Sequence, residues 1–208
     1  MHYFLTGTDT EVGKTIAAAW LMLKLDAAYW KPLQVGRHTE SDEQVVRQLT
    51  MFPEEAFAPS TYVLPDPLSP HYAAERCGAH IDLQQFKLPA YEEPLIVEGA
   101  GGVLVPLNEH SLMIDLMVQL ALPVILVART SLGTINHTLL SLEALRSRDL
   151  EITGVILNGT EQPHNTQAIE TYGKVRVLGQ IPPLSPLTTA GLMDIPPLFD
   201  IKEDGTII

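Results

Sequence analysis

Lys14 and Thr15 close the segment TGTDTEVGKT (6–15), which follows the apolar run HYFLT (2–6) and leads into KTIAAAWLMLKL (14–25). A glycine-rich turn between a strand and a helix directs backbone amides and the helix N-terminus toward an anion. In such a loop the lysine reaches the β- and γ-phosphates of a nucleotide, and the threonine hydroxyl binds Mg²⁺. The usual spacing has four residues between the glycines, whereas five separate Gly7 from Gly13. A plain turn with a solvated lysine is the alternative.

Three charged residues elsewhere could complete such a site. Glu98 ends the apolar run of LIVEGAGGVLVPL (95–107) and is followed by glycines, which let backbone approach a ligand closely. Mg²⁺ usually takes one or two carboxylates besides phosphate oxygens, so Glu98 and Asp42 are candidate ligands. Lys31, in YWKPLQVG (29–36), could stabilise charge on a transferring phosphoryl group. The alternatives are an exposed glutamate in a tight turn, a helix cap at Asp42 and a solvated lysine.

The order of the predicted elements would bring these residues together. Short apolar runs, expected to be strands, alternate with helical stretches. The runs at 94–100, 123–128 and 152–159 are rich in Val, Ile and Leu without alternation, as expected for parallel strands covered on both faces. We therefore predict an α/β fold of the phosphate-loop NTPase type, a doubly wound, mostly parallel sheet with helices on both faces. Ligands of such sheets bind beyond the carboxyl ends of the strands, where the candidate residues lie.

Size and composition narrow the classes of function. The 208 residues favour one nucleotide-binding domain over 1–208, and the proline-rich stretch after residue 182 predicts a mostly extended tail. A net charge of -12 argues against nucleic-acid and membrane partners, which need basic surface. The single cysteine, Cys77, forms no intramolecular disulfide; it favours a reducing compartment and is expected to be a small helix residue. With no signal sequence recognised, we expect a cytoplasmic protein.

The chain resembles the dethiobiotin synthetases, which are ATP-dependent ligases of biotin biosynthesis. The resemblance runs from about residue 3 to residue 184, and the five-residue glycine spacing is itself typical of that family. It rests on these segments, in this order: TGTDTEVGKT, KPLQVG, SPHYAA, VEGAGGVLVPL, TSLGTINHTLLSLEALR and GVILNG.

The resemblance implies that 7,8-diaminopelargonic acid, CO₂ and ATP give dethiobiotin through a carbamate and a carbamic-phosphoric anhydride, with Mg²⁺ as cofactor. It also implies a homodimer, because the family binds the substrate carboxylate close to the subunit boundary. Position by position it suggests Lys31 and Lys14 as catalytic residues and Thr15, Asp42 and Glu98 as metal ligands. The nucleotide- and substrate-binding positions it suggests are Glu11, Val12, Gly13, Lys14, Thr15, Ile16, Glu98, Gly99, Ala100, Gly101, Asn158, Pro182, Pro183 and Leu184.

The sequence departs from the family pattern at three places. Val35 stands where Ser or Thr commonly contacts the substrate, Gly159 replaces an aspartate often found after Asn158, and no clear acidic match follows Leu184. Competing interpretations are another ATP-dependent amidoligase, a nucleotide-dependent switch with a protein partner, or a catalytically silent relative. A GTPase is disfavoured because the Asn-Lys-x-Asp segment that recognises guanine is lacking.

Overall fold

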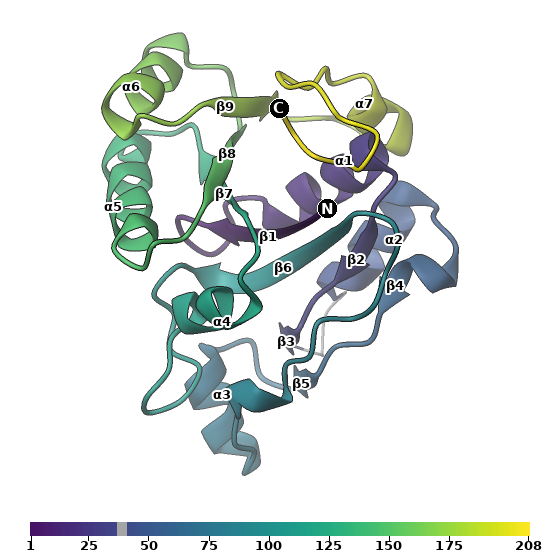
Figure 1. Cartoon of the computed structure of the whole chain (residues 1–208), viewed down its shortest axis with the longest axis vertical. Coiled ribbons are helices and arrows are strands. Elements are labelled where there is room, and N and C mark those ends of the chain that lie inside the picture. Colours follow the sequence, from purple (N-terminus) through teal and green to yellow (C-terminus); the bar gives the residue numbers. More distant parts are fainter. Residues whose placement is uncertain (37–40) are drawn as a thin grey trace.

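A computed structural model describes residues 1–36 and 41–208. Its strands and helices alternate along the chain (Figure 1). In chain order they are β1 His2–Gly7, α1 Lys14–Leu25, β2 Ala28–Trp30, β3 Leu33–Val35, α2 Asp42–Thr50, β4 Phe57–Ala58, β5 Tyr62–Leu64, α3 Pro70–Cys77, β6 Leu95–Gly102, α4 Met113–Leu120, β7 Val124–Arg129, α5 Thr134–Arg146, β8 Ile152–Asn158, α6 Pro163–Gly173, β9 Val177–Ile181 and α7 Thr189–Met193, with short 3₁₀ turns at Glu54–Ala56 and Leu83–Gln85.

The main sheet has seven strands in the order β4-β2-β6-β1-β7-β8-β9, and every recorded pairing in it is parallel. β1 lies at its centre between β6 and β7. Because parallel strands expose all their carboxyl ends at one edge, the loops after β1, β2 and β6 open on the same side. The predicted parallel α/β sheet is confirmed.

Two cores cover the two faces of this sheet. Side chains alternate between the faces of a strand, so Tyr3 and Leu5 pack with α1, α2 and α7, while Phe4 packs with α3, α4, α5 and α6. Figure 1 shows α1 and α4 on opposite sides of the central strands. The prediction of helices on both faces is therefore also confirmed.

The helices that carry candidate residues have clear local causes. α1 is built from strong helix formers, and it begins directly after Gly13. α2 begins with a capping box in which the Ser41 side chain and Gln44 satisfy each other's backbone amides. The cap of α2 is therefore Ser41, and Asp42 is the first helical residue, with its carboxylate free for other partners.

α6 begins at Pro163, because proline suits the first turn of a helix. β3 does not extend β2 but pairs with β5 in a separate two-stranded sheet. The tail predicted to be mostly extended contains α7, capped by Thr188 and packed on α1 through Leu192. Cys77 ends α3, as expected for a small helix residue.

The described helices are all too short or too polar to cross a bilayer.

The C-terminal segment lies against the start of β1. The Tyr3 hydroxyl donates a hydrogen bond to Gly205 O and accepts one from Ile207 N. Both contacts lie at the amino ends of the strands, away from the candidate residues.

Close packing between β9 and α1 gives a test of this fold. A Cβ atom at Gly179 would lie 2.5 Å from Cη2 of the fully buried Trp20. We therefore predict that Gly179→Ala lowers the free energy of unfolding by about 1–3 kcal/mol, because the indole has no room to shift. Urea denaturation measures this. Gly191→Ala in α7, where the nearest atoms lie 3.3 Å or more away, is the matched control and should change stability little.

Candidate active site

The segment between β1 and α1 forms a loop with backbone conformations suited to holding an anion. Glu11 and Gly13 have φ values of 56° and 94°, in the left-handed region. Gly13 is also hemmed in, since a Cβ there would lie 2.1 Å from Nδ2 of Asn158. That same amide donates to Val12 O at 3.1 Å, so the end of β8 braces the loop. This arrangement explains why position 13 requires glycine.

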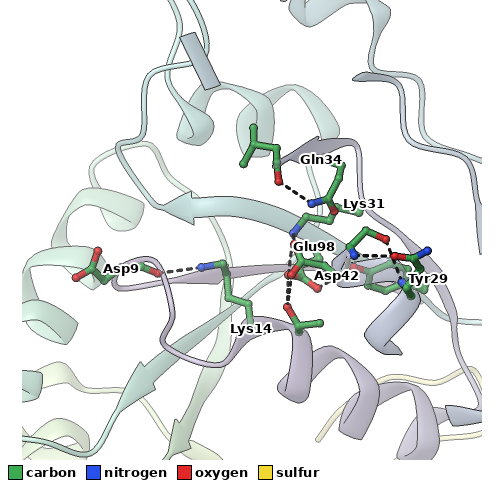
Figure 2. Close-up of polar contacts among 11 residues, drawn as sticks. Asp9, Lys14, Tyr29, Lys31, Gln34, Asp42 and Glu98 are labelled. Atoms are coloured by element: carbon green, nitrogen blue, oxygen red, sulfur yellow. Dashed lines mark hydrogen bonds and ion pairs between the residues drawn. The ribbon is translucent and has the colours of Figure 1, made fainter. Parts of the chain in front are cut away.

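Lys14 lies within the loop, with its side chain largely buried. Its Nζ donates to Asp9 O at 2.9 Å, where it spans the concave side of the loop (Figure 2). Burial lowers the pKa of Lys14 to about 8, although the nearby Glu98 carboxylate acts in the opposite direction. An anion bound in the loop would favour the protonated form again. The lysine is thus placed to meet a phosphate rather than bulk solvent.

A second group of charges lies beside the loop. Lys31 Nζ is 2.6 Å from Asp42 Oδ2 and 2.9 Å from Glu98 Oε1, with Lys31 and Glu98 almost fully buried (Figure 2). Burial alone would lower the pKa of Lys31, but the two carboxylates outweigh it and the pKa lies above its usual value. Conversely, burial would raise the pKa of Asp42, and the Lys31 ammonium outweighs that effect and lowers it. The group is a charged triad, not a solvated lysine.

Thr15 links the triad to the loop. Its hydroxyl lies 2.8 Å from Asp42 Oδ1 and 3.2 Å from Glu98 Oε1. Two carboxylates and a hydroxyl are hard oxygen donors, the kind that Mg²⁺ prefers. Among residues 1–36 and 41–208 there is no cluster of three or more His, Cys, Asp or Glu side chains that could hold a metal. The donor set therefore fits a cation that completes its shell with other oxygens, such as those of phosphates and water.

These residues share one cavity of about 360 Å³ at the start of α1. Its lining includes most of the positions expected from the sequence: Glu11, Gly13, Lys14, Thr15, Ile16, Lys31, Asp42, Glu98, Ala100 and Gly101. Thr10 and Val35 also line it and were not among the expected binding positions. Val35 thus lines the site, so its departure from the family pattern bears directly on the contacts that a ligand in the cavity would make.

The remaining expected positions lie apart from the cavity lining. Val12 is buried in the core, and Gly99 lies in β6, where a Cβ would touch the Phe4 ring. Asn158 ends β8 next to the phosphate loop. The strip Pro182, Pro183 and Leu184 follows β9, the strand that pairs with β8. Asn158 ends, and this strip follows, a strand that lies on the other side of β1 from β2, the strand that precedes Lys31.

Gly159 has a structural explanation. Its φ is 132°, and a Cβ there would lie 2.4 Å from the Thr130 hydroxyl oxygen. Its carbonyl accepts a hydrogen bond from Gln180 Nε2 at 2.8 Å. An aspartate would not fit this backbone conformation, so the departure at 159 is built into the packing between β8 and the loop after β7.

Besides Thr10, the sequence reasoning missed Tyr29, which contacts a residue of the site. Tyr29 lies in β2, two residues before Lys31, and its hydroxyl donates to Glu98 Oε2 at 2.8 Å. The signal available in the sequence was strand alternation, which places residues 29 and 31 on the same face. Composition gave no reason to separate this tyrosine from an ordinary core aromatic.

The charged triad gives a prediction about stability. Lys31→Met would leave two carboxylates without their ammonium partner, and breaking a buried ion pair in this way costs about 3–5 kcal/mol. We expect a loss of that order in urea unfolding at neutral pH without divalent cations. The double variant Lys31→Met, Glu98→Gln should recover part of the loss, because it removes the unpaired buried charge. Equal stability of Lys31→Met and the parent chain would contradict the ion-pair assignment.

Comparison with known proteins identifies the family of the chain. The family model described as an AAA domain matches residues 1–190. The ATP-dependent dethiobiotin synthetase of Paramagnetospirillum magneticum is 52% identical over 194 residues, which cover 93% of this chain and 94% of the relative. The enzyme of the same name from Rhodopseudomonas palustris strain BisA53 is 47% identical over 206 residues, 97% of both chains.

Solved structures resemble the fold at much lower identity. A ParA family ATPase from Chlorobium tepidum TLS superimposes with a TM-score of 0.52 at 14% identity, over 92% of this chain and 88% of that one. A chain of the MinC:MinD cell division protein complex of Aquifex aeolicus has a TM-score of 0.50 at 16% identity, over 91% of this chain and 86% of that one. These likenesses support the phosphate-loop NTPase fold alone. With relatives of about half-identical sequence over nearly its whole length, the chain belongs to the ATP-dependent dethiobiotin synthetase family.

Proposed function

We propose that the protein is an ATP-dependent ligase that closes the ureido ring of dethiobiotin from 7,8-diaminopelargonic acid and CO₂. The observation that carries the proposal is the convergence of Lys14, Thr15, Lys31, Asp42 and Glu98 in one cavity at the carboxyl edge of a parallel sheet. Phosphoryl transfer needs positioned cations more than covalent help, and this cavity supplies two ammonium groups and a set of oxygen ligands.

The reaction balances with the groups that the substrates bring. One amine of the substrate adds to CO₂ and loses a proton, which gives a carbamate. A carbamate oxygen attacks the γ-phosphorus, and the bond to the β-phosphate oxygen breaks, releasing ADP. The second amine then attacks the carbamic-phosphoric anhydride at carbon and loses a proton, and phosphate leaves as the ring closes. Each step forms or discharges negative charge close to the transferred phosphoryl group.

The residues of the cavity have distinct parts in this scheme. The loop amides and Lys14 would hold the β- and γ-phosphates, and Lys31 would lie beside the carbamate and the developing charge. Thr15, Asp42 and Glu98 would hold Mg²⁺, which when bound offsets phosphate charge. Nearby cations also favour the uncharged form of the second amine, which is the form that attacks. Asn158 and the strip from Pro182 to Leu184, at the carboxyl edge of the sheet, would lie beside the base of the nucleotide.

A phosphate-release assay tests the reaction. Purified protein with ATP, Mg²⁺ and bicarbonate should release phosphate only when the diamine is added, with dethiobiotin identified by mass. Lys14→Ala should lower kcat/KM by at least about 100-fold, because a cation aimed at the transferring phosphoryl group is lost. Lys24→Ala is the matched control. Lys24 lies in the last turn of α1, away from the cavity, and its ammonium donates to Met193 O, so the rate should stay unchanged. Release without the diamine would point to another ATPase reaction.

We further propose that the enzyme works as a homodimer in the cytoplasm. Leu104 and Leu140 are 55% and 57% exposed and line a second cavity, of about 370 Å³, together with Thr8 and Asp9 of the phosphate loop. Exposed leucines in such a cavity would be covered by a second copy of the chain. That copy would lie beside the loop, in keeping with a substrate carboxylate held near the subunit boundary.

Substitution of one leucine tests the dimer. Sedimentation equilibrium should give the mass of two chains, and Leu140→Glu should shift it toward one, because a carboxylate would be buried without a partner. Leu198→Glu is the control: this side chain is 59% exposed beside Phe199, which packs in the core on the other face of the sheet. Dimers of unchanged stability in Leu140→Glu would place the interface elsewhere.

A further inference from the structure

Tyr29 is an uncharged residue that contacts the Glu98 carboxylate from within the sheet. Its hydroxyl donates to Glu98 Oε2 at 2.8 Å, and Figure 2 shows it on the side of Glu98 away from Lys14. Tyr29 is 0% exposed and Glu98 1% exposed, so water does not compete for this bond. A buried hydrogen bond to an ionised acceptor is among the stronger kinds in proteins.

Strand register fixes this contact. In the parallel pair β2–β6, Tyr29 lies opposite Ile96. Since side chains two residues apart share a face, Tyr29 of β2, Lys31 directly after β2 and Glu98 of β6 all point toward α1 and α2. Thr15 lies in the first turn of α1, and Asp42 is the first residue of α2. The phenol therefore approaches the carboxylate from the sheet, and the other partners approach it from the cavity.

The two oxygens of Glu98 consequently have different surroundings. Oε1 lies 2.9 Å from Lys31 Nζ and 3.2 Å from the Thr15 hydroxyl, and it is the oxygen on the side of the proposed metal ligands. Oε2 accepts the Tyr29 hydroxyl. Burial first, and the Glu98 charge second, raise the pKa of Tyr29 well above its usual value, so the phenol remains a donor.

We propose that Tyr29 is a positioning residue that holds Glu98 as a one-oxygen ligand and thereby selects Mg²⁺ over larger cations. Mg²⁺ takes an octahedral shell of single oxygens, whereas Ca²⁺ takes more oxygens and often both of one carboxylate. With Oε2 held by the phenol, Glu98 offers a single oxygen to the cavity. This inference rests on the proposed metal site formed by Thr15, Asp42 and Glu98.

The test compares cation selectivity in Tyr29→Phe and in the parent chain. Mn²⁺ binding in the presence of ADP is followed by electron paramagnetic resonance, and bound Mn²⁺ is displaced with Mg²⁺ or Ca²⁺. Loss of an outer hydrogen bond to a metal ligand typically weakens binding about 10–100-fold, so Mg²⁺ should bind at least about tenfold more weakly. Ca²⁺ should lose less, so the ratio of Ca²⁺ to Mg²⁺ affinity should rise several-fold.

Tyr3→Phe is the matched control. Tyr3 is 1% exposed, and its hydroxyl also makes two hydrogen bonds, to Gly205 O and Ile207 N, at the other edge of the sheet. Both variants lose a buried hydroxyl and should lose stability, but only Tyr29→Phe should change the selectivity ratio. A shared loss of stability thus cannot imitate the expected result.

The outcomes separate the inference from the proposal beneath it. Mn²⁺ binding that Asp42→Asn abolishes, together with an unchanged Ca²⁺ to Mg²⁺ ratio in Tyr29→Phe, would overturn the part given to Tyr29 alone. Mn²⁺ binding that Asp42→Asn leaves intact would overturn the metal site, and the inference with it. Neither result depends on turnover, so the assignment of the ligase reaction is judged separately by the phosphate-release assay.

Discussion

The ion pair between Lys31 and Glu98 is the interaction around which the site is arranged. Both side chains are almost fully buried, and charges removed from water are tolerated only when each is matched by partners in good geometry. Asp42, Thr15 and Tyr29 supply those partners. They come from α2, α1 and β2, so three separate elements must be placed correctly before this buried ion pair is satisfied.

The parallel sheet places these partners because side chains alternate between its two faces along each strand. Because β1, β2 and β6 are neighbours, alternate residues on these strands share one face, and the helices covering that face begin close to the strands' carboxyl ends. The phosphate loop is positioned in the same way, because it follows the carboxyl end of β1 and leads into α1. It lies on the other side of Thr15 from the triad. One hydroxyl therefore belongs to both halves of the site, the loop that would hold phosphates and the triad beside it.

Much of this arrangement was accessible from the sequence because it depends on local patterns. The unbroken apolar runs predicted the strands, and residues that follow them, such as Lys31 and Glu98, predicted the functional edge. What the sequence could not supply was pairing between distant segments. The separation of β3 from β2 depends on β5, and the explanation for Gly159 depends on Thr130. Tyr29 was missed for the same reason, since its partner lies across the sheet in β6.

The position of β1 also determines when the site can form during synthesis. Phe4 of β1, a strand that precedes β6 and β7 in the chain, lies opposite Val97 of β6 and Val124 of β7. Until those segments exist, the loop after β1 has no neighbouring strand to hold it, and Glu98 has not yet been added to the chain. Contacts of such sequence separation close large loops and form slowly. The proposed nucleotide site, although its phosphate loop directly follows β1, is therefore completed only after β6 has joined the sheet.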